Sequence, residues 1–299
     1  MSKVTKYILF TFITSWAIEM IGIHDLDLNN AAGMLSFSQA MSLCMFMPTL
    51  GALFARADIR KMGWRLNIDR DLKLVLFAWF MPTVFELAGA MLYFIVFSSD
   101  YDPAVGFERI LDPNELAEFE KNGSHYAGYI AKEIFYSLTS FYTFLGIIMG
   151  LGEEIGWRGY MYPELKKGLG RTKAVLVGGV IHGAWHFPLM LFAGYEYGKE
   201  YYGAPLLGLF AFCIFTTATG MISFFLYERS HSIWLPAIIH GTTNAAFNVN
   251  LLRGNDHAER TIFGPPDIGL ISVIPMVIFA GYILYTENKR DSLDNGEEY

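Results

Sequence analysis

Residues 205–227 read PLLGLFAFCIFTTATGMISFFLY and contain no charged side chain. The hydrocarbon core of a bilayer is about 30 Å thick, and a helix of roughly 20 apolar residues crosses it. This stretch therefore predicts a membrane-spanning helix. Similar blocks recur along the 299 residues, of which 53% are hydrophobic and 17% charged, whereas an ordinary soluble domain carries roughly 25% charged residues. The composition is that of a membrane protein.

The apolar blocks predict an all-α, polytopic membrane protein. We expect about eight transmembrane helices, near residues 5–23, 36–56, 73–97, 132–152, 173–193, 205–227, 233–251 and 268–286. They would form one integral membrane domain over residues 1–299, ending in a polar, solvated tail at 287–299. Only two cysteines are present, which excludes a disulfide scaffold, and the net charge of −7 argues against a nucleic-acid partner.

Charged residues in the connections predict the orientation. Arginine and lysine gather in the connections 56–73 and 158–173, whereas the connection 98–131 is rich in aspartate and glutamate. Because basic loops stay on the cytoplasmic side, we expect the first two connections and both termini to be cytoplasmic. The predicted location is a prokaryotic plasma membrane, which the chain crosses several times.

Charged side chains inside a membrane are costly, so each one suggests a function. Glu153 and Glu154 directly follow an apolar run, and Arg158 lies four residues after Glu154, on the same face of a helix. Glu154 is therefore expected to pair with Arg158. Glu153 is rotated by about 100° and is free to face a cavity and accept a proton. The alternative is a cytoplasmic helix end with interfacial charges.

Two further pairs share helical faces inside predicted spans. His182 and His186 are four residues apart, as are His240 and Asn244. Imidazoles so placed bind a metal, orient a water or form hydrogen bonds within the bundle, and an imidazole with a carboxamide is a donor pair for an oxyanion. Counted from the helix ends, these groups and Glu153 converge in the cytoplasmic half of the membrane. A site that activates water for hydrolysis is predicted there.

These motifs resemble those of the CPBP intramembrane proteases, also called the Abi family, which include the CAAX prenyl endopeptidases of the Rce1 type. The first family pattern, Glu-Glu-x-x-x-Arg, is met by Glu153, Glu154 and Arg158. The second pattern ends in a histidine, which is His186 here, and the third is met by His240-x-x-x-Asn244. The resemblance covers a core of about residues 130–250. One departure is His182, since the family usually has an aromatic residue four positions before its histidine.

The resemblance implies roles for the motif residues. Glu153 would be the general base, His186 its partner, and His240 and Asn244 the donors to the oxyanion. Glu154, Arg158 and His182 would support them.

A metal site is the alternative to this assignment. The extra imidazole makes zinc coordination conceivable, through His182, His186, His240 and Glu153. The absence of a His-Glu-x-x-His motif favours a glutamate mechanism without a cofactor. Glu86, near the middle of the third span, is expected either to line the cavity or to pair with Arg158.

The favoured function is an intramembrane endopeptidase that cleaves a membrane-associated peptide or protein, of the prenylated CAAX type or another. One alternative is a non-proteolytic immunity protein that binds a toxin peptide or bacteriocin, since some members of the resembling family are associated with self-immunity. Another is a proton-coupled transporter using Glu86 and Glu153, which the lack of visible internal repeats disfavours. The expected partners are the substrate peptide and the lipid bilayer. The sequence does not predict an oligomeric state.

Overall fold

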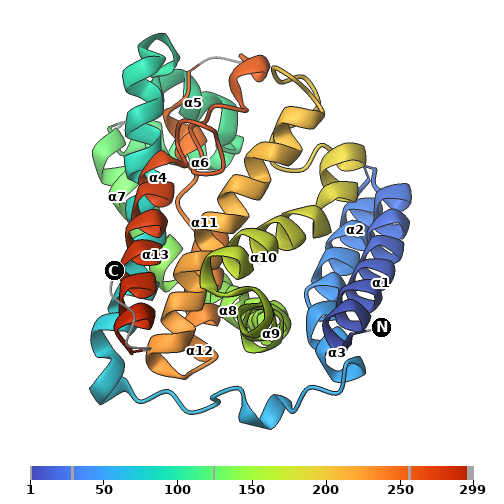
Figure 1. Cartoon of the computed structure of the whole chain (residues 1–299). Coiled ribbons are helices and arrows are strands. Elements are labelled where there is room, and N and C mark those ends of the chain that lie inside the picture. The colour runs from blue at the N-terminus through green and yellow to red at the C-terminus, as the bar shows by residue number, and fades with distance from the viewer. Residues whose placement is uncertain (1, 28–29, 124, 255–256, 295–299) are drawn as a thin grey trace.

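The structure of the chain is a computed structural model that describes residues 2–27, 30–123, 125–254 and 257–294 (Figure 1). Apart from one isolated bridge between Tyr101 and Arg253, its regular structure is helical in these ranges. The α-helices are α1 (Lys3–Asp25), α2 (Ala31–Cys44), α3 (Met47–Phe54), α4 (Ile68–Val96), α5 (Pro103–Ile110), α6 (Pro113–Lys121), α7 (Tyr126–Thr139), α8 (Phe141–Gly156), α9 (Tyr162–Leu169), α10 (Arg171–Trp185), α11 (Leu206–Ser230), α12 (Trp234–Asn244) and α13 (Ile274–Asp294). The all-α prediction is confirmed.

Four segments are long and apolar enough to cross a membrane: α1, Ala31–Phe54, α4 and α11. They match the predicted spans 5–23, 36–56, 73–97 and 205–227. A fifth candidate consists of Tyr126–Thr139 and Phe141–Leu169, which meet at a bend of 42°. These helices are those of an integral, multi-pass membrane protein. Within the described ranges, four or five spans meet the criteria of length and composition, and not the expected eight.

The other predicted spans differ from the helices in their ends. The span at 132–152 is broken at Ser140, whose side chain caps α8 by accepting a hydrogen bond from the Thr143 backbone N–H. Helix α12 ends at Asn244, so the prediction of a helix to residue 251 was wrong. Helix α10 ends at Trp185, and a π-helical turn, Leu189–Ala193, follows Pro188. The cap at Ser140 and the proline at position 188 are local features that hydropathy alone does not register.

Helices α8 and α12 pack closely because glycines face each other in the contact. A methyl group on Gly241 would lie 2.4 Å from the backbone nitrogen of Ile147, and one on Gly146 would lie 3.2 Å from the carbonyl oxygen of Gly241. Such small residues let two helix backbones approach within a membrane. The contact brings His240 of α12 beside the end of α8, where the two glutamates lie.

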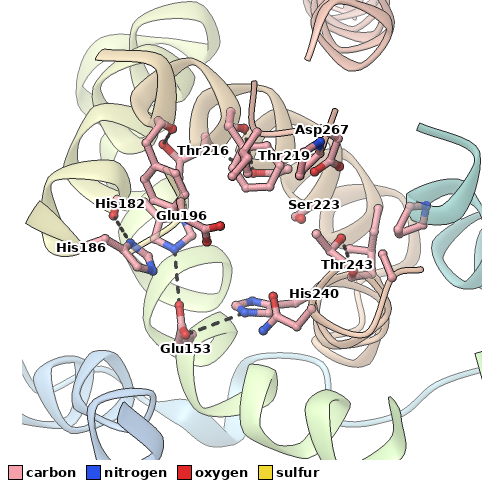
Figure 2. A pocket seen from close by; sticks show the side chains of 18 of the residues that line it. Glu153, His182, His186, Glu196, Thr216, Thr219, Ser223, His240, Thr243 and Asp267 are labelled. Atoms are coloured by element: carbon pink, nitrogen blue, oxygen red, sulfur yellow. Dashed lines mark hydrogen bonds and ion pairs between the residues drawn. The ribbon is translucent and has the colours of Figure 1, made fainter. Parts of the chain in front are cut away.

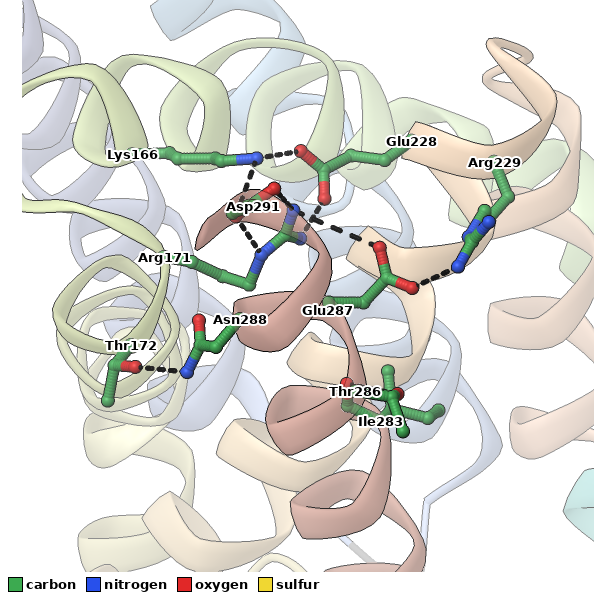
Figure 3. Close-up of polar contacts among 10 residues, drawn as sticks. All are labelled: Lys166, Arg171, Thr172, Glu228, Arg229, Ile283, Thr286, Glu287, Asn288 and Asp291. Carbon is green, nitrogen blue, oxygen red and sulfur yellow. Dashed lines mark hydrogen bonds and ion pairs between the residues drawn. The ribbon is translucent and has the colours of Figure 1, made fainter. Parts of the chain in front are cut away.

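An ion-pair network joins α13 to α10 and α11 (Figure 3). Arg171 at the start of α10 bonds Asp291 through Nε at 2.7 Å and also bonds Glu228, while Arg229 bonds Glu287. The side chain of Glu287 is 4% exposed. The polar tail predicted from residue 287 is helical over residues 287–294, where it continues α13 with Glu287 buried and Leu293 exposed; residues 295–299 lie outside the described ranges.

Candidate active site

A cavity of about 640 Å³ lies among the helices and is lined by every residue that the sequence motifs single out. These are Glu153, Glu154, Arg158, His182, His186, His240 and Asn244. They come from α8, from the π-helical turn Trp157–Met161 that follows it, from the end of α10 and from α12. The fold thus brings together residues as distant in the chain as Glu153 and Asn244.

Glu153 is buried and lies between two imidazoles (Figure 2). Its Oε2 accepts a hydrogen bond from Nε1 of Trp157 at 3.1 Å and lies 3.3 Å from Nε2 of His182. Its Oε1 lies 3.8 Å from Nε2 of His240. Both carboxylate oxygens therefore face nitrogen atoms at the edge of the cavity.

Glu154 has a different environment. Its Oε1 lies 2.8 Å from Nη1 of Arg158 and 2.8 Å from Nδ1 of His240. The ion pair with Arg158 that the spacing predicts is confirmed, and the arginine is almost completely buried. Because the carboxylate accepts hydrogen bonds and does not donate them when ionised, Nδ1 of His240 is the donor. Glu154 thereby fixes the orientation of the His240 ring.

His186 was expected to be the partner of Glu153, but the imidazole in contact with Glu153 is that of His182. Nδ1 of His186 lies 3.2 Å from the carbonyl oxygen of His182, so Nδ1 is the donor and Nε2 remains to act as an acceptor. The His186 ring packs edge-on against Phe212, with the ring centroids 4.9 Å apart. It lines the cavity beside His182, with 5.5 Å between the two ring centroids.

Asn244 is the last residue of α12 and lines the same cavity. His240 stands one turn before it, so both donors of the predicted oxyanion site border the space in front of Glu153. Thr243, between them, directs its hydroxyl to the carbonyl oxygen of Ile239 at 2.7 Å.

Carboxyl groups also line the far end of the cavity. Glu86 of α4 accepts a hydrogen bond from the Asp267 backbone N–H at 2.9 Å, so it lines the cavity and does not pair with Arg158. Asp267 and Glu196, from two loops, also line the cavity, and Figure 2 shows Asp267 across the pocket from Glu153. Withdrawal from bulk water raises the pKa of Glu196 to about 7 and that of Asp267 to about 6. Because both lie in polar connections, their sequence positions carried no signal of a cavity.

Glu19 of α1 is another lining residue that the motifs missed. It is fully buried, and it stands inside the first apolar block. The same argument that singled out Glu153, the cost of a charge within a span, would have found it.

In the ranges that the structure describes, no three His, Cys, Asp or Glu side chains are grouped as a metal site requires. Three nitrogen or oxygen donors would have to converge on one point about 2 Å from each. Instead His182 contacts Glu153 directly, and His240 is turned toward Glu154 by its Nδ1.

Comparison with known proteins identifies the part of the chain that carries this site. Residues 135–246 match the family described as type II CAAX prenyl endopeptidase Rce1-like. A curated relative, CAAX prenyl protease 2 of Methanococcus maripaludis, is 30% identical over 102 residues. That alignment covers 34% of this chain and 37% of the relative, so the chain matches little more than a third of the relative's length. All seven motif residues fall within the range matched by the family.

Proposed function

Because residues 135–246 form an Rce1-like type II CAAX prenyl endopeptidase domain, we propose that the chain is an intramembrane endopeptidase. It hydrolyses a peptide bond in a membrane-associated peptide or protein. The observation that carries this proposal is the placement of Glu153, buried at the edge of a cavity and within 4 Å of imidazole nitrogens from two other helices. The cavity lies in the cytoplasmic half of the membrane if the basic connections face the cytoplasm.

Glu153 is the general base of the proposed reaction. It takes a proton from a water molecule, whose oxygen then bonds to the carbonyl carbon of the substrate. The same carboxyl group next gives the proton to the leaving nitrogen as the C–N bond breaks. His182, in contact with Glu153, and His186 beside it orient the carboxylate and the water.

His240 and Asn244 stabilise the negative oxygen of the tetrahedral intermediate. A donor works best when it is held in place before the charge develops, because no energy is then spent on reorienting it. Glu154 supplies this restraint through Nδ1 of His240, and Arg158 balances the charge of Glu154. Because Nδ1 already donates to Glu154, His240 must be an imidazolium, protonated on both nitrogens, for Nε2 to donate to the oxyanion beside the Asn244 carboxamide.

The substrate we propose carries a lipid or a transmembrane segment near the scissile bond. Aromatic side chains line the cavity beside the polar groups, among them Phe85, Trp185 and Phe212. Such walls suit an apolar chain. A prenylated peptide of the CAAX type is the first candidate, as the name of the curated relative suggests.

We propose that the reaction proceeds without a metal, with zinc as the alternative. The test compares the wild-type protein with Glu153→Gln in lipid nanodiscs, using prenylated and unprenylated peptides, each with and without a chelator. Glu164→Gln is the matched control, because Glu164 pairs with Lys167 at the surface, outside the cavity. We expect Glu153→Gln to lower kcat by about 10²–10⁴-fold, and Glu164→Gln to retain activity.

Equal turnover by the wild-type protein and Glu153→Gln would contradict the proposed role of Glu153. Loss of activity on chelation with recovery in zinc would overturn the metal-free mechanism alone. Cleavage of the unprenylated peptide at the same rate would show that the lipid is not recognised.

A further inference from the structure

Helix α1 carries a line of polar residues that face the interior of the bundle. Tyr7, Thr11, Ser15 and Glu19 are each four residues apart and therefore lie along one face. All four have a relative exposure of 0%, whereas Ile13 on the outer side of the same helix is 66% exposed. An apolar helix in a membrane would ordinarily bury apolar or small residues along such a face, so these polar groups need an explanation. We call them the α1 polar line.

The polar atoms of this line are buried without a hydrogen-bond partner among the described residues. They are the hydroxyls of Tyr7, Thr11 and Ser15 and both carboxyl oxygens of Glu19. Hydroxyls in membrane helices usually bond to a carbonyl of the preceding turn, as Thr14 does with the carbonyl oxygen of Phe10 at 2.7 Å. Buried polar groups that lack a protein partner are typically satisfied by internal water.

The α1 polar line lies between two pockets. At one end, the Tyr7 ring contacts Tyr160, with 5.2 Å between the centroids, and Tyr160 lines a pocket of about 330 Å³ at the end of the bundle that carries the basic residues Lys3 and Arg56. At the other end, Glu19 lines the large cavity that holds Glu153. Twelve helical residues separate Tyr7 from Glu19, a distance of about 18 Å along the axis.

The facing helices leave room for the hydroxyl groups. A methyl group on Gly51 of α3 would lie 2.2 Å from Oγ1 of Thr11, so the hydroxyl rests in the space that a glycine leaves open. Cys44 of α2 donates to the carbonyl oxygen of Ser15 at 3.5 Å. Close helix–helix packing explains small residues such as Thr11 and Ser15. It does not explain Glu19, whose two buried carboxyl oxygens bond to no described residue.

We propose that the α1 polar line holds a file of water molecules that connects the pocket at the basic end with Glu153. This inference rests on the proposed function, since it supplies the one water molecule that each hydrolysis consumes. The water hydrogen-bonds to the hydroxyls in sequence and reaches the cavity at Glu19. An apolar peptide that fills the rest of the cavity then does not cut Glu153 off from water.

Thiol labelling tests the path without requiring catalysis. Thr11→Cys and Ser15→Cys are made in a chain that also carries Cys44→Ala and Cys213→Ala, and the protein in lipid vesicles is treated with a small, charged methanethiosulfonate. Ile13→Cys is the matched control at the same depth facing outward, and Lys3→Cys is the accessible reference. Because only the hydrated, ionised thiol reacts, we expect the two line positions to react within about tenfold of Lys3→Cys and at least about a hundredfold faster than Ile13→Cys. Reaction of both at the rate of Ile13→Cys would overturn the proposal.

Kinetics provide a second, independent readout. Replacing Thr11 by Val and Ser15 by Ala removes both hydroxyls while nearly preserving the volume. We expect kcat for the peptide to fall about tenfold with KM unchanged, and the control Thr14→Val, whose hydroxyl bonds its own helix, to leave both unchanged. Full kcat in the double variant would contradict a role in water supply. If no peptide is cleaved by any form of the protein, the labelling result still decides whether the line is hydrated.

Discussion

Glu153 and Glu154 are neighbours in the chain but have different partners, because successive helical residues point about 100° apart. Glu154 is balanced by Arg158 and holds His240, whereas Glu153 contacts Trp157 and His182. Of the two carboxylates, Glu153 is therefore the one without an arginine partner, and it is the one we propose as the general base.

The position of His182 leads to a prediction at this scale. The resemblance assigns the role of partner to His186, but His182 is the imidazole 3.3 Å from Glu153. We expect His182→Phe, which restores the aromatic residue usual in the family, to lower kcat by about 10²-fold with little change in KM, because Glu153 loses its nearest imidazole. Peptide cleavage by His182→Phe and His186→Ala, measured side by side, checks this.

The activities of the two variants distinguish the role of His182 from that of His186. A fully active His182→Phe with an inactive His186→Ala would show that His186 is the partner and that the contact of His182 with Glu153 is dispensable. A circular-dichroism melt of both variants serves as the control for folding.

At the scale of the elements, two features place the site. The π-helical turn Trp157–Met161 follows α8 directly, and Trp157 and Arg158 at its start reach back to Glu153 and Glu154 one turn earlier. Turns of this kind occur often at functional sites, since they widen the helix and re-aim its side chains. The second feature is the glycine contact of α8 with α12, which sets the distance from His240 to both carboxylates.

The glycine contact can be tested directly. In Gly241→Ala the new methyl group would lie 2.4 Å from the Ile147 backbone nitrogen, so α12 must move away from α8. We expect a loss of about 1–3 kcal/mol in stability and a larger loss of activity, since His240 moves with its helix. Thermal unfolding in detergent and peptide cleavage measure the two effects.

Gly281→Ala is the matched control, because a methyl group on Gly281 of α13 would meet nothing within 4 Å. We expect it to be neutral or to stabilise the protein by up to about 1 kcal/mol through helix propensity. Equal effects of the two substitutions would show that the α8–α12 contact is looser than the structure indicates.

At the scale of the whole molecule, the basic connection between α3 and α4, the beginning of α1 and the end of α13 lie toward the same, lower end of the bundle (Figure 1). Lys166, Arg171 and Arg229 join the ion-pair network that ties α13 to this end. We predict that this end faces the cytoplasm, because retained basic loops set the orientation of membrane proteins. A fluorescent protein fused after residue 299 is then expected to fluoresce, and alkaline phosphatase fused at residue 121 to be active.

The reverse pattern of reporters would refute the predicted orientation. If only one of the two reporters were active, both fusion points would lie on the same side of the membrane, and an odd number of crossings between them would have been misassigned. Cysteine labelling at Asp58, in the basic connection, is an independent check in the unfused protein.

The sequence alone predicted the helical class, four matching spans, the pairing of Glu154 with Arg158 and the seven motif residues that line the cavity. Each follows from short-range rules: the length of an apolar block, or the four-residue period of a helix. Only the tertiary structure shows the contact of His182 with Glu153, the orientation of His240 by Glu154, the hydrogen bond of Glu86 and the presence of Glu19 in the cavity that holds Glu153. These contacts depend on how closely α1, α8, α10 and α12 approach one another. The distances between these helices are set by glycines, helix caps and a π-helical turn acting together, and no local sequence pattern encodes them.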